Sequence, residues 1–343
     1  MSALTYAVER AVAIQAVLKA TQVCQTVFQK LVTEETLTKK DKSPVTVADF
    51  GAQAVVNSIL QQHFPGDPVV GEEDSKDLRG EAGRAMREKV LDLANSVLDA
   101  PLSEEKLLAA IDIGNSQGGQ AGRMWCLDPI DGTKGFLRGD QYAVCLALIV
   151  DGRVRLGVMG CPNLPVDLKN PVGERGSLFI AVEGQGAFQR PFSSDKETRI
   201  HMADVSSISQ AAFCESFESG HSSQSDSARI AELLGISKPP IRMDSQAKYC
   251  AISRGDADIY LRLPVPGLGY VEKIWDHASG DLLVKEAGGI VTDIHGKELD
   301  FSVGRLLSKN KGVIAAAAKI HPQVLQAVQT VLLGSSGKGG NNL

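Results

Sequence analysis

The segment WCLDPIDGTKGF, residues 125 to 136, decides how this chain is organised. Apolar residues at 124 to 127 predict a strand that ends at Asp128, and the proline and glycine that follow predict a tight turn. The turn carries two carboxylates, Asp128 and Asp131. We therefore expect both acidic side chains to lie together at the end of a strand, where they can face a cleft.

Upstream of this turn the pattern is mainly helical. Residues 4 to 31 and 47 to 64 have apolar side chains at helical spacing, and Asp49 falls in the first turn of the second predicted helix. A short strand at 68 to 70 runs into the acidic Gly71–Asp74 segment. Residues 75 to 110 are charged, partly helical and without a strand pattern, which predicts a surface insertion or a lid.

Downstream of the turn the pattern changes near residue 195. Apolar runs at 142 to 150, 154 to 159 and 178 to 182 predict antiparallel strands, so residues 1–195 are expected to form an α+β domain. Strands and helices then alternate, which predicts a layered α/β domain over residues 196–335. The glycine-rich tail, residues 336–343, is expected to be disordered.

Composition limits the class of protein. The chain has 343 residues, of which 43% are hydrophobic, and 36 basic residues against 41 acidic ones give a net charge of −5. This balance argues against a broad nucleic-acid surface, which needs an excess of basic residues. No apolar run approaches the ~18 residues of a membrane span. The six cysteines form no Cys-x-x-Cys pair, which favours buried free thiols in a reducing compartment and a soluble intracellular protein.

Four acidic elements stand at junctions between predicted elements: Asp49, Glu72, the Asp128–Asp131 turn, and Asp276 at the start of a predicted helix over 274 to 287. Carboxylates gathered in one cleft repel one another, and Mg²⁺ prefers oxygen ligands. The pattern therefore predicts metal-assisted hydrolysis of a phosphate ester. The alternative is that these residues only cap turns and helices.

Other groups in the same turn suit this chemistry. The Ile130 carbonyl could face a metal ion, because Pro129 stiffens the turn. The backbone N–H groups of Gly132 and Thr133 could hold phosphate oxygens as a small nest. The Thr133 hydroxyl could orient a water molecule.

Three segments resemble the inositol monophosphatase superfamily of Mg²⁺-dependent, lithium-sensitive phosphatases. They are GEED at 71 to 74, WCLDPIDGTKGF at 125 to 136 and WDHASGDLLVKEAGG at 275 to 289, and the resemblance runs from about residue 5 to residue 335. Within the superfamily, SPVTVADFGAQ at 43 to 53 and the segment 128 to 149 are most similar to 3′(2′),5′-bisphosphate nucleotidases. The resemblance implies a layered αβαβα sugar-phosphatase-like fold with the active site between two sub-domains.

The resemblance also implies an activity. Members of this branch remove the 3′-phosphate from adenosine 3′,5′-bisphosphate to give AMP, and act on 3′-phosphoadenylyl sulfate, by in-line attack of a metal-activated water. About two to three Mg²⁺ ions are implied as cofactors. By the same analogy we expect a cytoplasmic monomer, without nucleic-acid or membrane partners, that clears a by-product of sulfate assimilation and is linked to salt tolerance.

Residue roles follow from the same resemblance. Glu72, Asp128 and the Ile130 carbonyl correspond to ligands of a first metal, and Asp128, Asp131 and Asp276 to ligands of a second. Asp49 and Thr133 match the pair that activates water. Further residues correspond to substrate contacts: Asp128, Asp131, Gly132, Thr133, His221, Ser245, Lys248 and Arg262. Lys248 and Arg262 would suit a second phosphate, because Arg binds phosphate as a fork and Lys as a point charge.

Three other functions stay open on the sequence. The metal motifs also fit an inositol monophosphate or polyphosphate phosphatase, and a fructose-1,6-bisphosphatase-like sugar enzyme is a more distant possibility. A non-catalytic sensor of metal and nucleotide is the alternative from another class, but Asp49, Glu72 and Thr133 are all present.

Overall fold

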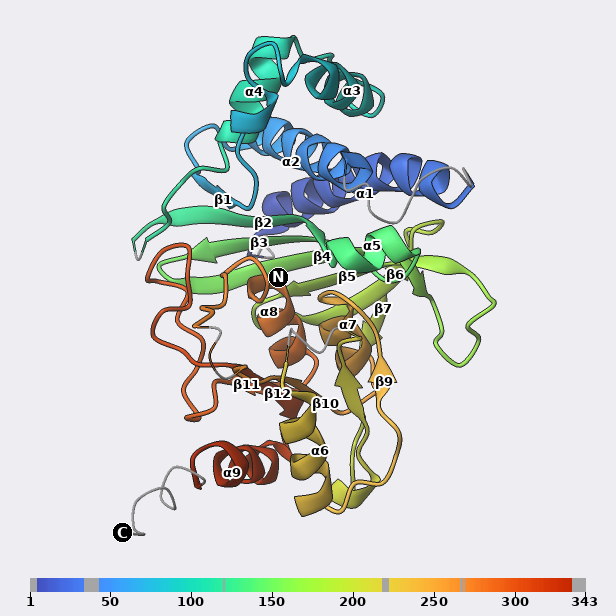
Figure 1. Ribbon diagram of the computed structural model, residues 1–343, viewed down its shortest axis with the longest axis vertical. Coiled ribbons are helices and arrows are strands. Elements are labelled where there is room, and N and C mark those ends of the chain that lie inside the picture. The colour runs from blue at the N-terminus through green and yellow to red at the C-terminus, as the bar shows by residue number, and fades with distance from the viewer. Residues whose placement is uncertain are drawn as a thin grey trace.

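The computed structural model describes residues 5–33, 43–119, 121–217, 222–265, 267 and 269–334. Five layers follow one another along the long axis of the molecule (Figure 1). Helices α1 (Ala7–Thr33) and α2 (Ser43–His63) cover a seven-stranded sheet, and α7 (Ala247–Ser253) and α8 (Ala278–Glu286) form the middle layer. A five-stranded sheet and the helices α6 (Gln224–Leu233) and α9 (His321–Leu332) complete the stack. The expected αβαβα layering is confirmed.

The first sheet has its strands in chain order: β1 (Val69–Gly71), β2 (Arg123–Asp131), β3 (Ala143–Val150), β4 (Arg153–Pro165), β5 (Arg175–Val182), β6 (Gly186–Pro191) and β7 (Thr198–Ile200). Neighbouring strands are antiparallel except β1 and β2, which run parallel with Val70 opposite Cys126. In β3 every residue before Val150 is buried. Helices cover both faces of this sheet, so its central strands are apolar without alternation.

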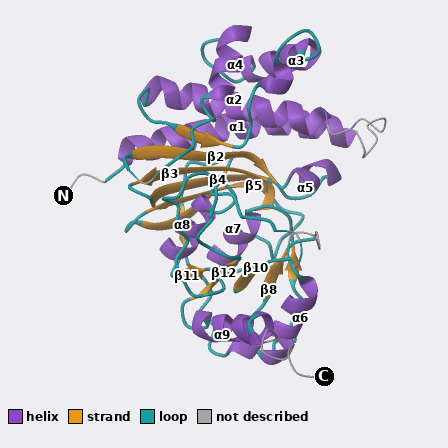
Figure 2. Ribbon diagram, turned by 60° about the vertical axis from the view of Figure 1, so that its left-hand side comes forward, coloured by secondary structure: helices purple, strands orange, loops and turns teal. Residues whose placement is uncertain are grey.

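The second sheet has the order β11 (Gly289–Thr292), β12 (Val313–Ala317), β10 (Ile259–Arg262), β8 (Phe213–Glu215) and β9 (Ile241–Arg242). β8 pairs in parallel with β9 and β10, whereas β12 is antiparallel to both of its neighbours. Figure 2 shows the two sheets as separate layers with α7 and α8 between them.

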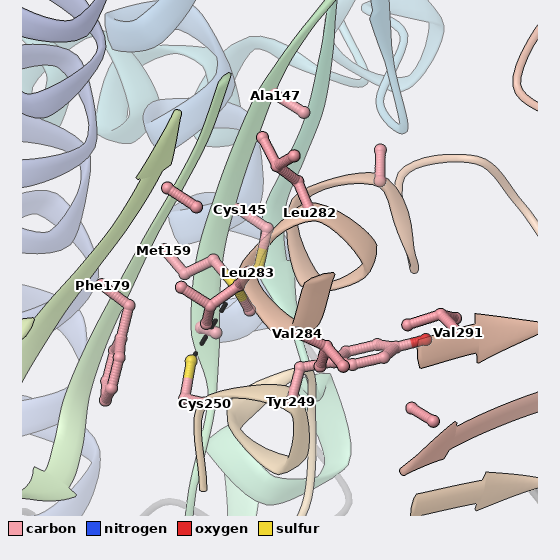
Figure 3. Close-up of a cluster of buried hydrophobic side chains, with 14 of the residues drawn as sticks. Cys145, Ala147, Met159, Phe179, Tyr249, Cys250, Leu282, Leu283, Val284 and Val291 are labelled. Carbon is pink, nitrogen blue, oxygen red and sulfur yellow. Dashed lines mark hydrogen bonds between the residues drawn. The ribbon is translucent and has the colours of Figure 1, made fainter. Parts of the chain in front are cut away.

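The middle layer holds the two sheets together through one buried apolar cluster (Figure 3). Cys145, Met159 and Phe179 of the first sheet lie opposite Leu282 and Leu283 of α8. The Sγ atoms of Cys161 and Cys250 lie 3.7 Å apart in this cluster. All six cysteines are free and buried, as the sequence predicted.

Three boundaries differ from the sequence prediction. α2 begins at Ser43, so Asp49 lies inside the helix rather than in its first turn, because a proline is tolerated near a helix start. β2 continues to Asp131, with a register shift against β3 between Asp128 and Asp131. α8 begins only at Ala278, so Trp275 and Asp276 lie in the turn before it.

Residues 75 to 110 form the 3₁₀ turn η1 (Lys76–Leu78), α3 (Arg84–Asn95) and most of α4 (Glu104–Asp112). The structure places no strand in this segment, and its role as a surface insertion or a lid stays a prediction. Val90, Ala94 and Leu107 are fully buried in the cluster that contains α2. α3 and α4 thus pack on the outer side of α2, at the top of Figure 1.

One helix, Ala7–Leu31, is long and apolar enough to cross a membrane by length and composition alone. In the folded chain 44% of its most apolar window is buried. Val17 and Ala20 are fully buried, in the cluster that α1 shares with α2 and the first sheet. The core helix of a soluble protein passes the same test, so this is weak evidence for a span.

The division of the chain into residues 1–195 and 196–335 remains our proposal. β7 pairs with β6 of the first sheet, and α8 of the second part packs against β4 and β5 of the first. His221 and the tail, residues 336–343, lie outside the described residues.

Candidate active site

A cavity of about 190 Å³ contains residues from both halves of the chain. Its lining residues are Glu72, Asp128, Ile130, Asp131, Gly132, Thr133, Lys134, Asp244, Ser245, Gln246, Lys248, Tyr260, Arg262, Tyr270, Asp276 and His277. The folding of the chain thus brings together most of the residues singled out in the sequence. Asp49 does not line this cavity, and His221 is not described.

Asp128, Asp131 and Asp276 form the centre of the site. One carboxylate oxygen from each lies within 4.8 Å of the others, an arrangement that could hold a metal ion. In a regular strand, residues 128 and 131 would face opposite sides of the sheet. The register shift between them removes this alternation, so both carboxylates reach the same cavity.

Glu72 joins this centre because β1 and β2 are parallel and end at the same edge of the sheet. Gly71 pairs with Leu127, so Glu72 follows on directly beside Asp128. Burial, with repulsion from Asp276, Glu73 and Asp131, raises the pKa of Glu72 to about 8, although a hydrogen bond with Asp128 opposes the shift. Burial and repulsion from Glu72 raise the pKa of Asp128 well above its ordinary range.

The carboxylate centre fits a divalent cation. The Oδ1 atoms of Asp49 and Asp128 are buried and have no hydrogen-bond partner among the described residues. Burial and the charge of Asp131 raise the pKa of Asp276 to about 6. A bound cation would satisfy these oxygens and remove the repulsion, and a purely oxygen donor set is the kind that hard divalent ions prefer.

Asp49 lies behind this centre, within α2. Its side chain is buried, and burial together with repulsion from Glu73 and Glu72 raises the pKa of Asp49 well above its ordinary value. Thr133 lies at the start of α5 (Thr133–Arg138) and is exposed to the cavity. Among the described residues no hydrogen bond joins Asp49 to Thr133.

The cations predicted for a second phosphate line the same cavity. Lys248 is buried, donates from Nζ to the Ser245 carbonyl at 2.7 Å and lies 5.4 Å from the centre of the Tyr260 ring. Burial lowers the pKa of Lys248, and the charge of Asp131 opposes this shift. Arg262 pairs through Nε with Glu272 at 3.0 Å.

Sequence reasoning missed Gln246 and His277. Gln246 donates its backbone N–H to the Asp131 carboxylate, and its side-chain amide donates to the Trp275 carbonyl at 2.9 Å. His277 contacts the Tyr249 hydroxyl at 2.8 Å and Glu272 at 3.1 Å. Gln246 directly follows Ser245, and His277 directly follows Asp276, two residues that the sequence singled out. The burial of Gln246 and His277 was not visible in the sequence.

Gln53 was also missed. Its buried side chain donates to the carbonyls of Glu73 at 2.6 Å and Ile111 at 2.9 Å, and accepts from the Glu73 N–H at 3.1 Å. Since Gln53 lies one helical turn after Asp49, a single helix carries the buried carboxylate and holds the acidic segment after β1. Asp74, in contrast, pairs with the exposed Lys76 at 2.9 Å.

The chain belongs to the inositol monophosphatase family, whose match covers residues 6–333. A relative from Emericella nidulans, named 3′(2′),5′-bisphosphate nucleotidase, is 50% identical over 96% of this chain and 99% of that protein. A relative of the same name from Schizosaccharomyces pombe is 47% identical over 96% of this chain and 97% of that protein.

Solved structures support the fold. SuhB of Mycobacterium tuberculosis superposes with a TM-score of 0.61 at 21% identity, covering 96% of this chain and 99% of that one. CysQ of Bacteroides thetaiotaomicron, described as a bacterial member of the inositol monophosphatase family, superposes with a TM-score of 0.58 at 22% identity, covering 92% and 99%.

Proposed function

We propose that this protein is a Mg²⁺-dependent phosphatase that hydrolyses the 3′-phosphate of adenosine 3′,5′-bisphosphate to give AMP and phosphate. We propose 3′-phosphoadenylyl sulfate as a second substrate. One observation carries the proposal: a single cavity is lined by the acidic centre of Asp128, Asp131 and Asp276 and by the cations Lys248 and Arg262. The names of the relatives support this substrate over an inositol phosphate.

The acidic residues would hold the metal ions. Glu72, Asp128 and the Ile130 carbonyl would form one group of ligands, and Asp128, Asp131 and Asp276 the other. Bound Mg²⁺ supplies positive charge that offsets the charge of the phosphate during hydrolysis. Asp128 would belong to both groups, which agrees with its burial and with its unpartnered oxygen.

The remaining residues would bind and orient the substrate. The N–H groups of Gly132 and Thr133 would hold oxygens of the 3′-phosphate. Asp49 and the Thr133 hydroxyl would orient the attacking water, and Asp49 would take its proton as general base. Because a carboxylate of raised pKa is the stronger base, the burial of Asp49 suits this role.

The 5′-phosphate would bind Lys248 and Arg262. Arg262 is oriented for this by Glu272, which is itself held by His277. Ser245 and His221 would complete the nucleotide contacts, His221 by resemblance alone. This second phosphate distinguishes the substrate from an inositol monophosphate.

The test is phosphate release from adenosine 3′,5′-bisphosphate, inositol 1-phosphate and inositol 1,4-bisphosphate, side by side, with Mg²⁺ and with a chelator. We expect preference for the nucleotide and no release with the chelator. Preference for an inositol phosphate would overturn the nucleotide assignment. Metal binding without turnover of any substrate would favour the sensor function.

A matched pair of substrates tests the second phosphate. In Arg262→Gln, KM for adenosine 3′,5′-bisphosphate should rise about tenfold or more, because a charge-assisted hydrogen bond is lost. KM for adenosine 3′-monophosphate, which has no 5′-phosphate, should change little. An equal rise for both substrates would contradict the assignment of Arg262.

We also propose a cytoplasmic monomer that clears a by-product of sulfate assimilation and is inhibited by lithium. Li⁺ would compete for the site of Asp131 and Asp276. Phosphate release measured over a lithium series, together with the mass of the protein in solution, tests these points.

A further inference from the structure

Arg305 lies in the segment between β11 and β12, which runs beside the turn that carries Asp276. The Ile274 N–H donates to the Arg305 carbonyl at 3.1 Å, and the Leu307 N–H donates to the Glu272 carbonyl at 2.9 Å. A β-bridge between Lys273 and Leu306 lies between these two hydrogen bonds. The backbone of Arg305 is therefore held in register with the residues that precede Asp276.

The side chain of Arg305 reaches the first sheet. Its guanidinium donates to the carbonyl of Gly71, the residue before Glu72. It also donates to the carbonyls of Gly114 at 3.0 Å and Ser116 at 2.9 Å. The Gly71 N–H donates to the Gly114 carbonyl at 2.8 Å, so Arg305 contacts both partners of this pair.

The same guanidinium packs on Trp275, the residue before Asp276. Its central carbon lies 4.8 Å from the centre of the indole ring, within the range of a cation–π contact. Trp275 is only 7% exposed. Within the described ranges no carboxylate forms an ion pair with Arg305, so its polar contacts are all made to main-chain carbonyls.

These contacts connect the two walls of the acidic centre. Glu72 comes from the first sheet and Asp276 from the second part of the chain, and their negative charges repel each other. Because the two carboxylates come from different parts of the chain, their spacing depends on the contacts between these parts near the site. Arg305 contacts the residue preceding each of them with one planar group.

We propose that Arg305 is a positioning residue that sets the spacing between Glu72 and Asp276 and so determines how tightly the site binds divalent metal. The proposal rests on the metal site of the proposed function. Arg305 touches neither carboxylate directly; it acts through Gly71 and Trp275. Groups that orient metal ligands typically change affinity about 10–100-fold when they are removed.

The test compares Arg305→Met, Arg305→Lys and the control Arg254→Met. Arg254 is buried and donates to the carbonyls of Pro165 and Val166 at 2.8 and 3.2 Å. It also lies 5.7 Å from the centre of the Phe179 ring. Like Arg305, it thus contacts main-chain carbonyls and an aromatic ring, here at a place outside the cavity, but it also forms an ion pair with Asp256 that Arg305 does not have. Mg²⁺ and Mn²⁺ binding are measured by calorimetry, and folding by circular dichroism.

We expect Arg305→Met to bind both ions about tenfold more weakly than the native chain, with Arg305→Lys in between. Arg254→Met should lose thermal stability but keep native metal affinity. With saturating metal, KM for the nucleotide should stay near its native value in Arg305→Lys, because no substrate contact is removed.

Native metal affinity in a folded Arg305→Met or Arg305→Lys protein would overturn the proposal. An equal loss of metal affinity in Arg254→Met would also overturn it, because the effect would then follow stability. If the native chain binds metal but hydrolyses no nucleotide, the proposed function fails, while the calorimetric comparison still decides the role of Arg305.

Discussion

Gly132 and Ser245 meet at the cavity so closely that a Cβ on Gly132 would lie 2.7 Å from the Cβ of Ser245. Both have positive φ, 90° for Gly132 and 63° for Ser245. Gly132 follows the β2 carboxylates, and Ser245 precedes Gln246, whose N–H binds Asp131. Any side chain at residue 132 would therefore separate the two halves of the site.

Gly132→Ala should lower both stability and activity. The positive φ costs about 1–3 kcal/mol for a residue with a Cβ, and the collision with Ser245 adds to it. Gly139→Ala is the control, because φ is 85° there and a Cβ would meet nothing within 4 Å. Both variants should lose stability in urea unfolding, and Gly132→Ala should lose far more phosphate release. Equal activity losses would refute the contact.

Asp128→Asn should stabilise the metal-free protein. The pKa of Asp128 is raised by burial and by Glu72, so at pH 7 folding must either keep a charge that the site disfavours or take up a proton, and either one lowers the free energy of unfolding. We expect Tm to rise without metal, and the increase in Tm on adding Mg²⁺ to disappear. Thermal melts with Mg²⁺ and with chelator measure both effects.

Asp112→Asn is the control, because the pKa of Asp112 is lowered in the folded protein whereas that of Asp128 is raised. Hydrogen bonds from Ser75 and Arg79 lower the pKa of Asp112 despite its burial, so its ionised form stabilises the fold. The variant should lower Tm equally with and without metal. An Asp128→Asn protein that melts below the native chain in chelator would contradict our account of the acidic centre.

Gln53→Leu should lose activity out of proportion to stability. The substitution leaves the part-buried Glu73 N–H and carbonyl without their side-chain partner, at a cost of up to about 1–3 kcal/mol, and frees the segment that carries Glu72. Asn57→Leu is the control: one turn further along α2, Asn57 is buried and donates to the Ala110 carbonyl at 2.8 Å.

Both α2 variants should unfold at lower urea concentration, but only Gln53→Leu should need more Mg²⁺ for half-maximal phosphate release. The same Mg²⁺ requirement in the two proteins would show that Gln53 serves stability alone.

His321 should make the second sheet sensitive to acid. It is buried at the start of α9 against the Thr292 hydroxyl, and burial lowers its pKa below 6.5. Below about pH 6.5, His321 becomes protonated in the unfolded chain but stays neutral in the folded chain. The free energy of unfolding therefore falls as the pH falls towards the pKa of His321 in the folded chain. Each unit of depression is worth about 1.4 kcal/mol.

His321→Gln should reduce this loss of stability between pH 7 and pH 5, measured by urea unfolding at each pH. The control His63→Gln changes an exposed residue and should leave the loss of stability between pH 7 and pH 5 as it is in the native chain. An unaltered pH profile in His321→Gln would show that other groups cause the acid sensitivity.

Where a segment's structure depends on its own residues, the sequence was a sufficient guide. The apolar run in β3 predicts a strand whatever surrounds it, and Gly288 ends α8 because glycine takes the positive φ of a helix end, here 92°. The same local logic, with the family resemblance, picked out Glu72, Asp128, Asp131 and Asp276.

Only the tertiary structure decided how these groups meet. The bulge that turns Asp128 and Asp131 to one side depends on pairing with β3, and the contacts of Gln53, Gln246 and Arg305 join residues distant in the chain. A residue's burial and partners follow from the packing of separate layers, which no local pattern records. The sequence by itself thus determined the layers and the acidic groups of this protein, and long-range packing determined the geometry in which those groups can act.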